Sequence, residues 1–300
     1  MQLRPLCPEL EEIARNELNE DPKRIGADIQ HIRDWIARQP HLKARTDEQW
    51  IVSFLRGCKY SLERVKEKID LYYTLRTTAS DLWQYKYNEA KFMEILDLGA
   101  VLILPKSQNV TSPRVILIRS GCYDANKYHI SDILSVSNVI REIAMYDDDT
   151  FVVAGGIALQ DLNGTTAGHY LQMTPTMRKK MILSGQDCSP MRAKGTHFIN
   201  TPPGFETTFN LMKGLLSEKN RSRVKLYKYI PKDILPAEYG GNAGTIAEII
   251  DFWKKKITQY SSWLEEDFDN GTDESKRAGK PMTAEDLFGV DGSFRQLEFD

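Results

Sequence analysis

The first third of the chain has apolar residues at helical spacing. They recur every three or four positions at Ile25, Ile29, Ile32 and Ile36, then from Trp50 to Leu55, then from Val65 to Tyr73. This spacing places the apolar side chains on one face of each helix. We predict a helical N-terminal region, in which Thr46 and Ser61 stand where helix N-caps are expected.

After Leu96 the pattern changes to short β-prone runs, most of them separated by helical stretches. The runs are residues 101–105, 114–121, 151–162, 195–200 and 223–227. Strands that alternate with helices predict an α/β fold whose sheet is covered by helices. Residues 83–100 have a mixed pattern, and we predict a linker there.

The last part of the chain changes composition again. Residues 265–281 are acidic, then mixed in charge, with glycines and a proline, which predicts a flexible linker. The aromatic stretch LFGVDGSFRQLEF follows it. We predict that Leu287, Phe288, Phe294 and Leu297 dock back on the folded domain.

Charge and composition narrow the function classes. The 300 residues have a net charge of −2 and a pI near 6.3, which argues against a generally basic nucleic-acid binder. Cys7, Cys58, Cys122 and Cys188 form no C-x-x-C pair, so zinc-ribbon and redox motifs are unsupported. The chain has neither a secretory h-region nor an apolar run approaching about 18 residues. We therefore expect a cytoplasmic protein, with no nucleic-acid partner.

Catalytic signatures are missing from the sequence. It contains no G-x-S-x-G, G-x-x-x-x-G-K-[ST], G-x-G-x-x-G or H-E-x-x-H motif. His197 is either a core residue of a β-prone run or a catalytic group, and Asp161 either a turn residue or a catalytic carboxylate. The GGNAG run at 240–244 favours a turn over a phosphate cradle. We expect no catalytic residue, no metal and no cofactor.

The stretch GFETTFNLMKGLLSEKNRSR predicts an amphipathic helix over 204–223. Its apolar stripe contains Phe205, Thr208, Phe209, Met212, Leu215 and Leu216. In GGIALQDL one strand face carries Gly156, Ala158 and Gln160, which are small or polar. Large apolar groups opposite small ones leave volume for a ligand, although the stripe could instead pack directly on the sheet.

Methionines supply a second part of the predicted pocket. Met173, Met177 and Met181 are spaced i, i+4, i+8, and Thr174 with Pro175 resembles the start of a helix. Methionine adapts to irregular apolar guests, although such a stripe is also common in an ordinary core. Together with the small strand face, the stripe leaves pocket and core equally favoured.

Two basic clusters flank the apolar stretch. Lys219, Arg221 and Arg223 close it, and Arg192 with Lys194 precedes the HFIN strand. Cations at a helix C-terminus complement its dipole. The alternative is a site for an anionic headgroup, because each Lys or Arg contributes about 1 kcal/mol near an acidic membrane surface.

Several motifs, in order, resemble the CRAL-TRIO lipid-binding family. They are EQWIVSFLRGCKYSLERVKEKI, GGIALQDLNG, LQMTP, SPMRAKGTHFINTPPGF, LLSEKNRSRVKLY and DILPAEYGG, within residues 25 to 260. The sequence is most similar to the animal branch with alpha-tocopherol transfer protein, retinaldehyde-binding protein and the clavesins. The closing DLFGVDGSFRQL resembles insect members.

The resemblance implies an α/β fold in which a mixed, largely parallel sheet floor is covered by helices. It implies an N-terminal helical domain over 1–90, a lipid-binding domain over 91–262 and a tail over 263–300. A mobile lid helix over 203–223 would contact ligand through Phe205, Thr208, Phe209, Met212 and Leu216. The expected pocket wall is Leu134, Ser137, Ala158, Gln160, Met173, Met177, Met181 and Thr196.

The resemblance also implies a headgroup site. Positions that bind a phosphatidylinositol bisphosphate in the tocopherol-transfer branch fall on Arg192, Lys194, Lys219 and Arg223, and Arg221 lies between the last two. The sequence departs from the branch at Gln160, Asn138 and Arg141 in the pocket region, and at Gly214 in the lid. A buried amide without a partner costs about 1–3 kcal/mol, so these departures predict a ligand with a polar group, or ordered water.

The sequence thus predicts a monomeric lipid-transfer protein that exchanges one small hydrophobic ligand, namely a tocopherol, retinoid, carotenoid or similar isoprenoid. Exchange would occur during transient association with phosphoinositide-containing endosomal or plasma membranes. A phospholipid-sensing adaptor that presents lipid to a partner protein is one alternative. An esterase that uses His197 is another.

Overall fold

The computed structural model describes residues 3–202, 224–226 and 231–289. Helices dominate the region before the sheet, as the apolar spacing predicts. They are α1 (Pro8–Leu18), α2 (Ile25–Ala37), α3 (Glu48–Gly57), α4 (Leu62–Thr78) and α5 (Ala90–Asp97), with a short 3₁₀ helix at Ser80–Leu82. Asp47, rather than Thr46, caps α3 by accepting a 2.9 Å hydrogen bond from the amide of Trp50. Ser61 does occupy the N-cap position of α4, without a side-chain cap bond.

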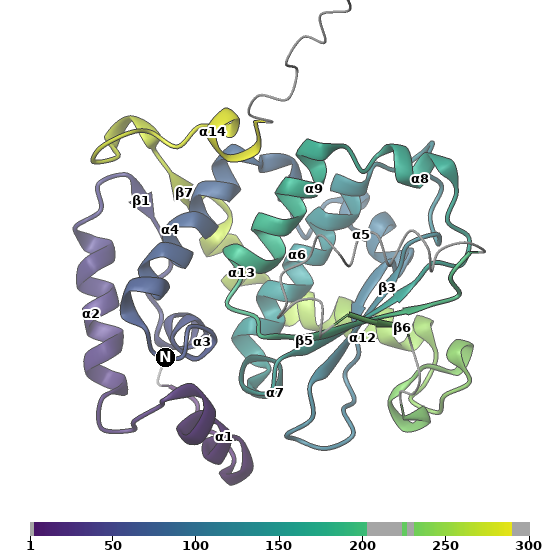
Figure 1. The fold of residues 1–300 in the computed structure, drawn as a ribbon, viewed down its shortest axis with the longest axis horizontal. Helices are drawn as coiled ribbons and strands as arrows, with labels where there is room; N and C mark the ends of the chain where they lie inside the picture. The colour runs from purple at the N-terminus through teal and green to yellow at the C-terminus, as the bar shows by residue number, and fades with distance from the viewer. Residues whose placement is uncertain (1–2, 203–223, 227–230, 290–300) are drawn as a thin grey trace, which may run out of the picture.

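The main sheet, part of which is labelled in Figure 1, has five strands, and their order is β2-β3-β4-β5-β6. They are β2 (Val101–Ile103), β3 (Arg114–Arg119), β4 (Gly156–Asp161), β5 (Ala193–Ile199) and β6 (Val224–Leu226). β2 runs antiparallel to β3, and the remaining neighbours are parallel. The prediction of a mixed, largely parallel sheet with helical cover is confirmed.

Helices that follow β3 and β4 lie over one face of this sheet (Figure 1). They are α6 (Ile130–Asp147), α8 (Ala167–Leu171) and α9 (Pro175–Ile182), which continues into a π-helical turn at Leu183–Asp187. The helix α12 (Ile246–Gln259) packs on α5 and α6, and its Trp253 Nε1 donates to the carbonyl of Ile103, 2.9 Å away. One buried apolar core runs from α2, α3 and α4 to the sheet.

Two local predictions are wrong. Residues 151–153 belong to the short helix α7 (Asp149–Val153), because Asp148 caps the amide of Phe151 and outweighs the β-propensity of the valines. The stretch 83–100 contains α5, whose Phe92, Ile95 and Leu96 are buried. It is therefore a packed helix over 90–97 rather than a linker.

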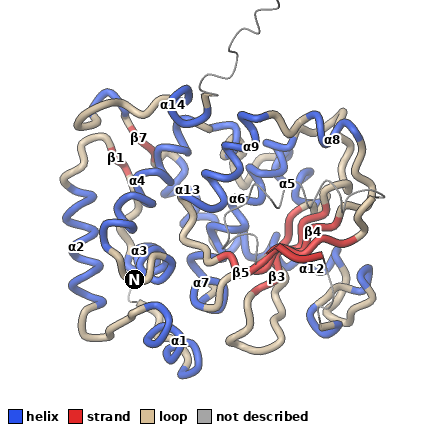
Figure 2. Tube along the Cα trace, viewed as in Figure 1, coloured by secondary structure: helices blue, strands red, loops and turns tan. Residues whose placement is uncertain are grey.

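The predicted flexible linker at 265–281 is also wrong. It contains the end of α13 (Ser261–Phe268), the strand β7 (Gly271–Thr272) and a 3₁₀ helix at Glu274–Lys276. β7 pairs with β1 (Leu42–Lys43) in a separate two-stranded sheet (Figure 2). Arg277 Nη1 reaches the Asp70 carboxylate of α4 at 2.6 Å. Contacts distant in sequence therefore order a segment whose composition favours disorder.

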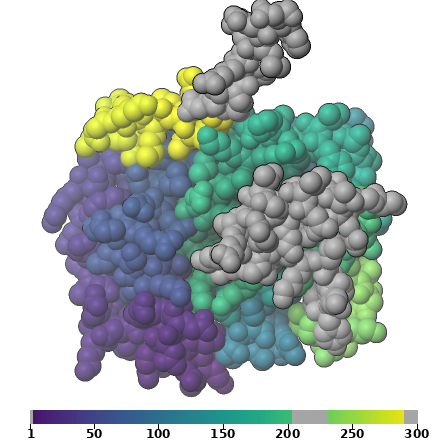
Figure 3. All heavy atoms as spheres, in the orientation of Figure 1, coloured from purple at the N-terminus to yellow at the C-terminus, as the bar shows by residue number. Residues whose placement is uncertain are grey.

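The C-terminal segment docks as predicted where the structure describes it. Helix α14 (Ala284–Phe288) contacts α9, and Phe288 is buried with Leu287 packed against the core. Figure 3 shows this segment, in yellow, lying across both the N-terminal helices and the teal region. Phe294 and Leu297 lie outside the described residues. Among the described helices, none is long and apolar enough to span a bilayer.

Candidate functional site: a cavity over the sheet

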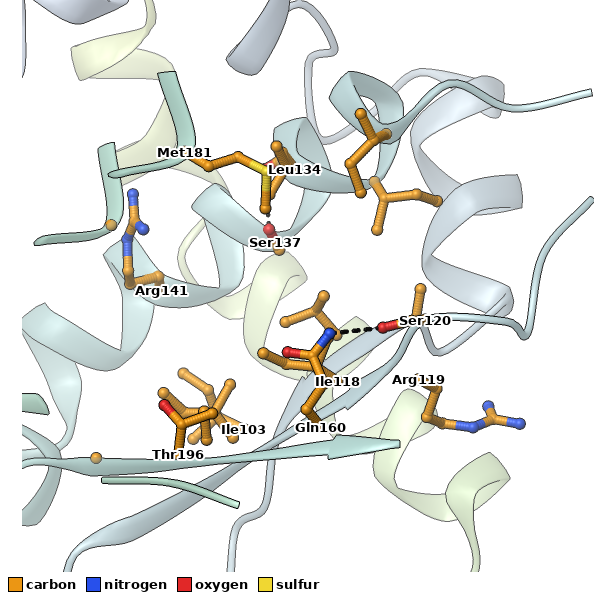
Figure 4. Close-up of a pocket in the computed structure, with 18 of the residues that line it drawn as sticks. Ile103, Ile118, Arg119, Ser120, Leu134, Ser137, Arg141, Gln160, Met181 and Thr196 are labelled. Carbon is orange, nitrogen blue, oxygen red and sulfur yellow. Dashed lines mark hydrogen bonds between the residues drawn. The ribbon is translucent and has the colours of Figure 1, made fainter. Parts of the chain in front are cut away.

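A cavity of about 400 Å³ lies between the sheet and helices α6 and α9 (Figure 4). This volume is within the range of small-molecule sites. Strands β2 to β5 supply the floor, and α6, α8 and α9 supply walls. Its lining is predominantly apolar, with Ile103, Ile116, Ile118 and Leu134 among its residues.

The small face of β4 borders the cavity, as the strand alternation predicts. Gly156, Ala158 and Gln160 line it, whereas Leu159 is buried on the other side of the sheet. Ala158 is in register with Thr196 of β5, which also lines the cavity. A Cβ at Gly156 would lie 3.1 Å from Ile116 Cδ1. Small residues here therefore preserve open volume above the sheet.

Helix α6 forms the opposite wall through positions at helical spacing. Leu134, Ser137 and Arg141 line the cavity from successive turns. The helix begins with a capping box, in which the Asp132 carboxylate accepts from the amide of His129 at 2.7 Å. A capped first turn fixes the register of the residues that follow it.

The methionine prediction is partly wrong. Thr174 caps α9 through the amide of Met177 and Pro175 occupies its first turn, as predicted. Met173 and Met181 line the cavity, but Met177 is 6% exposed and packs in the hydrophobic core. Met173 precedes the N-cap, so the three side chains do not share one continuous helical stripe.

Two of the predicted polar departures have protein partners. Gln160 Nε2 donates to Ser120 Oγ at 2.7 Å (Figure 4). Asn138 is buried, donates from Nδ2 to the carbonyl of Leu82 at 2.8 Å and does not line the cavity. The expectation that the ligand region includes Asn138 is therefore wrong, because its side chain is used between α6 and the N-terminal helices.

The cavity has arginines at two places. Arg119 Nη1 donates to the carbonyl of Leu98 at 3.2 Å. Arg141 lines the cavity from α6, and its buried Nε and Nη2 have no hydrogen-bond partner in the described part of the chain. Figure 4 shows the two side chains at opposite sides of the drawn site. No aspartate or glutamate occurs among the described lining residues.

Histidines near the sheet have contrasting positions. His169 lines the cavity, and both ring nitrogens are engaged: Nδ1 with Thr166 Oγ1 at 2.9 Å and Nε2 with the Tyr123 carbonyl at 3.0 Å. His197 follows Thr196 on β5 and is absent from the cavity lining. Strand alternation directs these neighbours to opposite faces. The His197 side chain therefore lies away from a ligand in the cavity.

Asp161 and the glycine run have structural contacts. Asp161 Oδ1 accepts from the amide of Asn163 and from Asn200 Nδ2, both at 2.9 Å, and Oδ2 accepts from the Tyr239 hydroxyl at 2.5 Å. This network joins the end of β4 to the segment after β6. Gly240 has a φ of 71° and follows the 3₁₀ helix Ala237–Tyr239, so the GGNAG run is a turn, as predicted.

Two of the predicted headgroup cations converge on one carboxylate. Glu17 Oε2 of α1 lies 2.8 Å from Arg192 Nη2 and 3.7 Å from Lys194 Nζ. The hydrogen bond from Arg192 and the charge of Lys194 lower the pKa of Glu17 despite partial burial. Glu17 was not anticipated, because nothing in its sequence neighbourhood points to a partner 175 positions away.

The remaining predicted site residues lie outside the described residues. These are the cations Lys219, Arg221 and Arg223 and the lid positions Phe205, Thr208, Phe209, Met212 and Leu216. Sequence analysis also missed cavity residues on β3, including Ile116 and Ile118. Their alternation in RVILIRSG, one residue in two, was the available signal.

Comparisons with known proteins agree with this architecture. Residues 103–241 match the model of the CRAL/TRIO domain, and residues 21–87 match that of the Pinta-like UBA domain. The human protein "Alpha-tocopherol transfer protein-like" is 29% identical over 248 residues, covering 78% of this chain and 70% of its own. Rat clavesin-2 is 29% identical over 246 residues, covering 79% and 75%.

A search of solved structures returned the crystal structure of Sfh5. It is 13% identical, has a TM-score of 0.48 and covers 86% of this chain and 100% of that chain. The similarity to the CRAL/TRIO domain is therefore a similarity of sequence over residues 103–241.

Proposed function

We propose that this chain, whose residues 103–241 belong to the CRAL-TRIO domain family, carries one small hydrophobic molecule and exchanges it at phosphoinositide-containing membranes. The family binds lipids and transfers hydrophobic ligands. The cavity of about 400 Å³ is the observation that supports a carrier function here. Burial of an apolar ligand would supply binding at about 25 cal/mol per Å² removed from water.

The pocket wall in this proposal consists of the predicted residues that border the cavity. They are Leu134, Ser137, Ala158, Gln160, Met173, Met181 and Thr196. A ligand lying on the floor of β4 would contact α6 and α9 at the same time. The relative named for alpha-tocopherol transfer makes a tocopherol one ligand to test.

The membrane part of the proposal rests on the basic residues. Arg192 and Lys194 lie at the start of β5 and share the Glu17 carboxylate, so an anionic headgroup could engage both. Lys219, Arg221 and Arg223 join the proposed headgroup site on sequence grounds. We propose endosomal or plasma membranes as the place of exchange.

Filling the cavity tests the carrier function. In Ala158→Phe an aromatic ring would enter from β4, and we expect loss of ligand capture with native secondary structure retained. The measurement is native mass spectrometry after incubation with a panel of tocopherol, retinoids, carotenoids and phospholipids. Ala284→Phe, on the exposed face of α14, is the matched control.

The same panel tests the competing functions. Ligand bound by the wild type and by Ala284→Phe but not by Ala158→Phe supports the cavity as the carrier site. Capture of phospholipid alone would favour a lipid-sensing adaptor. Failure of the wild type to retain any member of the panel would contradict a carrier function.

A further inference from the structure

Arg141 is a cation at the cavity for which the described protein provides no counter-ion. Its Nε and Nη2 are buried and make no hydrogen bond with any residue that the structure describes. In Figure 4 the guanidinium stands at the Met181 side of the drawn site, away from the Gln160–Ser120 hydrogen bond. The unpaired nitrogens are the two donors on one edge of the guanidinium plane, the edge that forms parallel bonds to a carboxylate.

The same edge binds carboxylates elsewhere in this chain. Arg56 reaches Glu20 through Nε at 2.8 Å and Nη2 at 3.2 Å. Arg114 reaches Asp148 through Nε at 2.7 Å and Nη2 at 3.2 Å. Arg141 has the same two donors, Nε and Nη2, but no carboxylate among the described residues accepts from them.

Neighbouring groups do not supply the missing charge. Glu142, the next residue on α6, accepts instead from the Tyr72 hydroxyl and from Trp83 Nε1 in the N-terminal region. Burial raises the pKa of the Cys188 thiol to about 12, although the charge of Arg141 lowers it, so this thiol is neutral at pH 7. Arg119, the other arginine in the cavity lining, adds positive charge.

An arginine remains charged at every physiological pH, so it cannot remove this cost by losing a proton. A buried charge without a partner is destabilising by several kcal/mol. A purely hydrocarbon ligand, or one with a single hydroxyl, would displace water from the cavity without replacing the missing anion. A ligand that carries an anion at one end would pair with Arg141 and bury its apolar remainder against Leu134, Met181 and the sheet.

We propose that the cavity selects an amphipathic lipid with a carboxylate group, whose two oxygens pair with Nε and Nη2 of Arg141. This assignment rests on the proposed carrier function and names the class of its cargo. The apolar lining accommodates the chain, and Arg141 determines the preference for the acid over the corresponding alcohol. The expected cargo is therefore a long-chain or isoprenoid carboxylic acid.

Paired ligands test this assignment in the full-length protein. Equilibrium binding of radiolabelled oleic acid and oleyl alcohol at pH 7.4 compares the same chain with and without a carboxylate. We expect the acid to bind the wild type at least tenfold more tightly, which corresponds to about 1.4 kcal/mol. In Arg141→Met that preference should disappear, because the acid loses affinity while the alcohol keeps or gains it.

Two further variants separate a pairing role from a packing role. Arg141→Lys keeps the charge but not the two-donor edge, so we expect part of the acid preference to return. Arg178→Met makes the same change as Arg141→Met at an exposed position of α9 that does not line the cavity, and it should leave the preference unchanged. Thermal unfolding without ligand should show that Arg141→Met is at least as stable as the wild type.

The outcomes distinguish this inference from the carrier function. Equal binding of acid and alcohol by the wild type, or an unchanged preference in Arg141→Met, would overturn the carboxylate assignment and leave the carrier function intact. Binding of neither ligand, together with failure of the wider lipid panel, would contradict the carrier function itself. If lysophosphatidic acid binds more tightly than oleic acid, the carboxylate assignment is wrong and the anionic group that Arg141 binds is a lipid phosphate.

Discussion

At the scale of single residues, Glu17 occupies a position that a phosphate could take. Its carboxylate pairs with Arg192 and Lys194, while Arg192 Nη1 also donates to the carbonyl of Val153. Glu17 comes from α1, whose Leu10, Ala14 and Leu18 pack with Val153 in a small separate cluster. A headgroup that binds this cation pair would have to displace the side chain of an N-terminal helix.

Removing this internal carboxylate should strengthen membrane binding. For Glu17→Gln we expect up to about fivefold tighter binding to vesicles with phosphatidylinositol bisphosphate, because exposed ion pairs are typically worth 0–1 kcal/mol. Vesicle co-sedimentation at pH 7 measures the change. Glu12→Gln makes the same charge change at an exposed position of α1 and should have no comparable effect.

The pH dependence of this contact follows from the lowered pKa of Glu17. The group ionises more readily in the folded state, so the contact is complete above its ordinary value of 4.5 and is lost as the pH falls below it. The difference between Glu17→Gln and the wild type should therefore be constant from pH 6 to 8. A difference that varies across that interval would show that another group controls the cation pair.

At the scale of elements, long-range contacts outweigh local composition. The segment 265–281 has the composition of a linker, yet β7 pairs with β1 and Arg277 contacts Asp70 in α4. Residues 151–153 have β-propensity, yet a cap at Asp148 starts a helix there. Periodicity predicted α2, α3 and α4, because their apolar faces repeat over several turns. Short elements held by distant partners have no such repeat.

The Glu274–Arg277 pair makes the attachment of the C-terminal segment sensitive to acid. Burial tends to raise the pKa of Glu274, but bonds from Arg277 and the amide of Met282 lower it to about 2. The stabilisation is therefore present above pH 4.5 and lost as the pH falls towards 2. We expect Glu274→Gln to reduce the free energy of unfolding by urea at pH 6 and to have a smaller effect at pH 3.

Glu285→Gln is the comparison for this measurement, because Glu285 is exposed on α14. It should change the free energy of unfolding by less than about 0.5 kcal/mol at either pH. An equal loss in Glu274→Gln at pH 6 and pH 3 would mean that hydrogen-bond geometry, rather than the charge of Glu274, holds the segment.

At the scale of the whole molecule, the C-terminal segment packs on α9, one of the helices that border the cavity. Phe288 is 3% exposed, and the carbonyl of the next residue, Gly289, accepts from Lys179 of α9 at 3.1 Å. Helix α9 also supplies Met181 to the cavity. Helix α9 therefore contacts the docked tail and also borders the cavity.

Shortening the buried Phe288 side chain should affect both the stability of the protein and its retention of ligand. For Phe288→Ala we expect a loss of about 3 kcal/mol in the free energy of unfolding and faster ligand release, because α9 loses its support. Stopped-flow release of a bound fluorescent lipid and urea unfolding measure the two effects. Leu171→Ala, at a side chain 80% exposed on α8, should change neither substantially. If Phe288→Ala is destabilised but releases the ligand at the wild-type rate, docking of the tail does not control ligand retention.

The candidate site was predictable where it depends on local periodicity. The small face of β4 and the α6 positions Leu134 and Ser137 follow from strand and helix repeats. The unpaired edge of Arg141 does not, because a missing partner is a property of the surrounding fold. The prediction that Met177 lines the pocket was wrong. It assumed one helical stripe from Met173 to Met181, but the helix begins after Thr174, so Met173 does not belong to it.

Helix α6 and strand β2, which both border the cavity, are each hydrogen-bonded to a tryptophan side chain. Arg141 lines the cavity, and Glu142 accepts a 2.9 Å hydrogen bond from Trp83 Nε1 in the N-terminal region. On the sheet, the backbone of the cavity residue Ile103 accepts from Trp253. Both indoles are thus hydrogen-bonded to elements that border the cavity. Occupancy of the cavity should shift intrinsic fluorescence, so the unlabelled protein can report its own loading in real time.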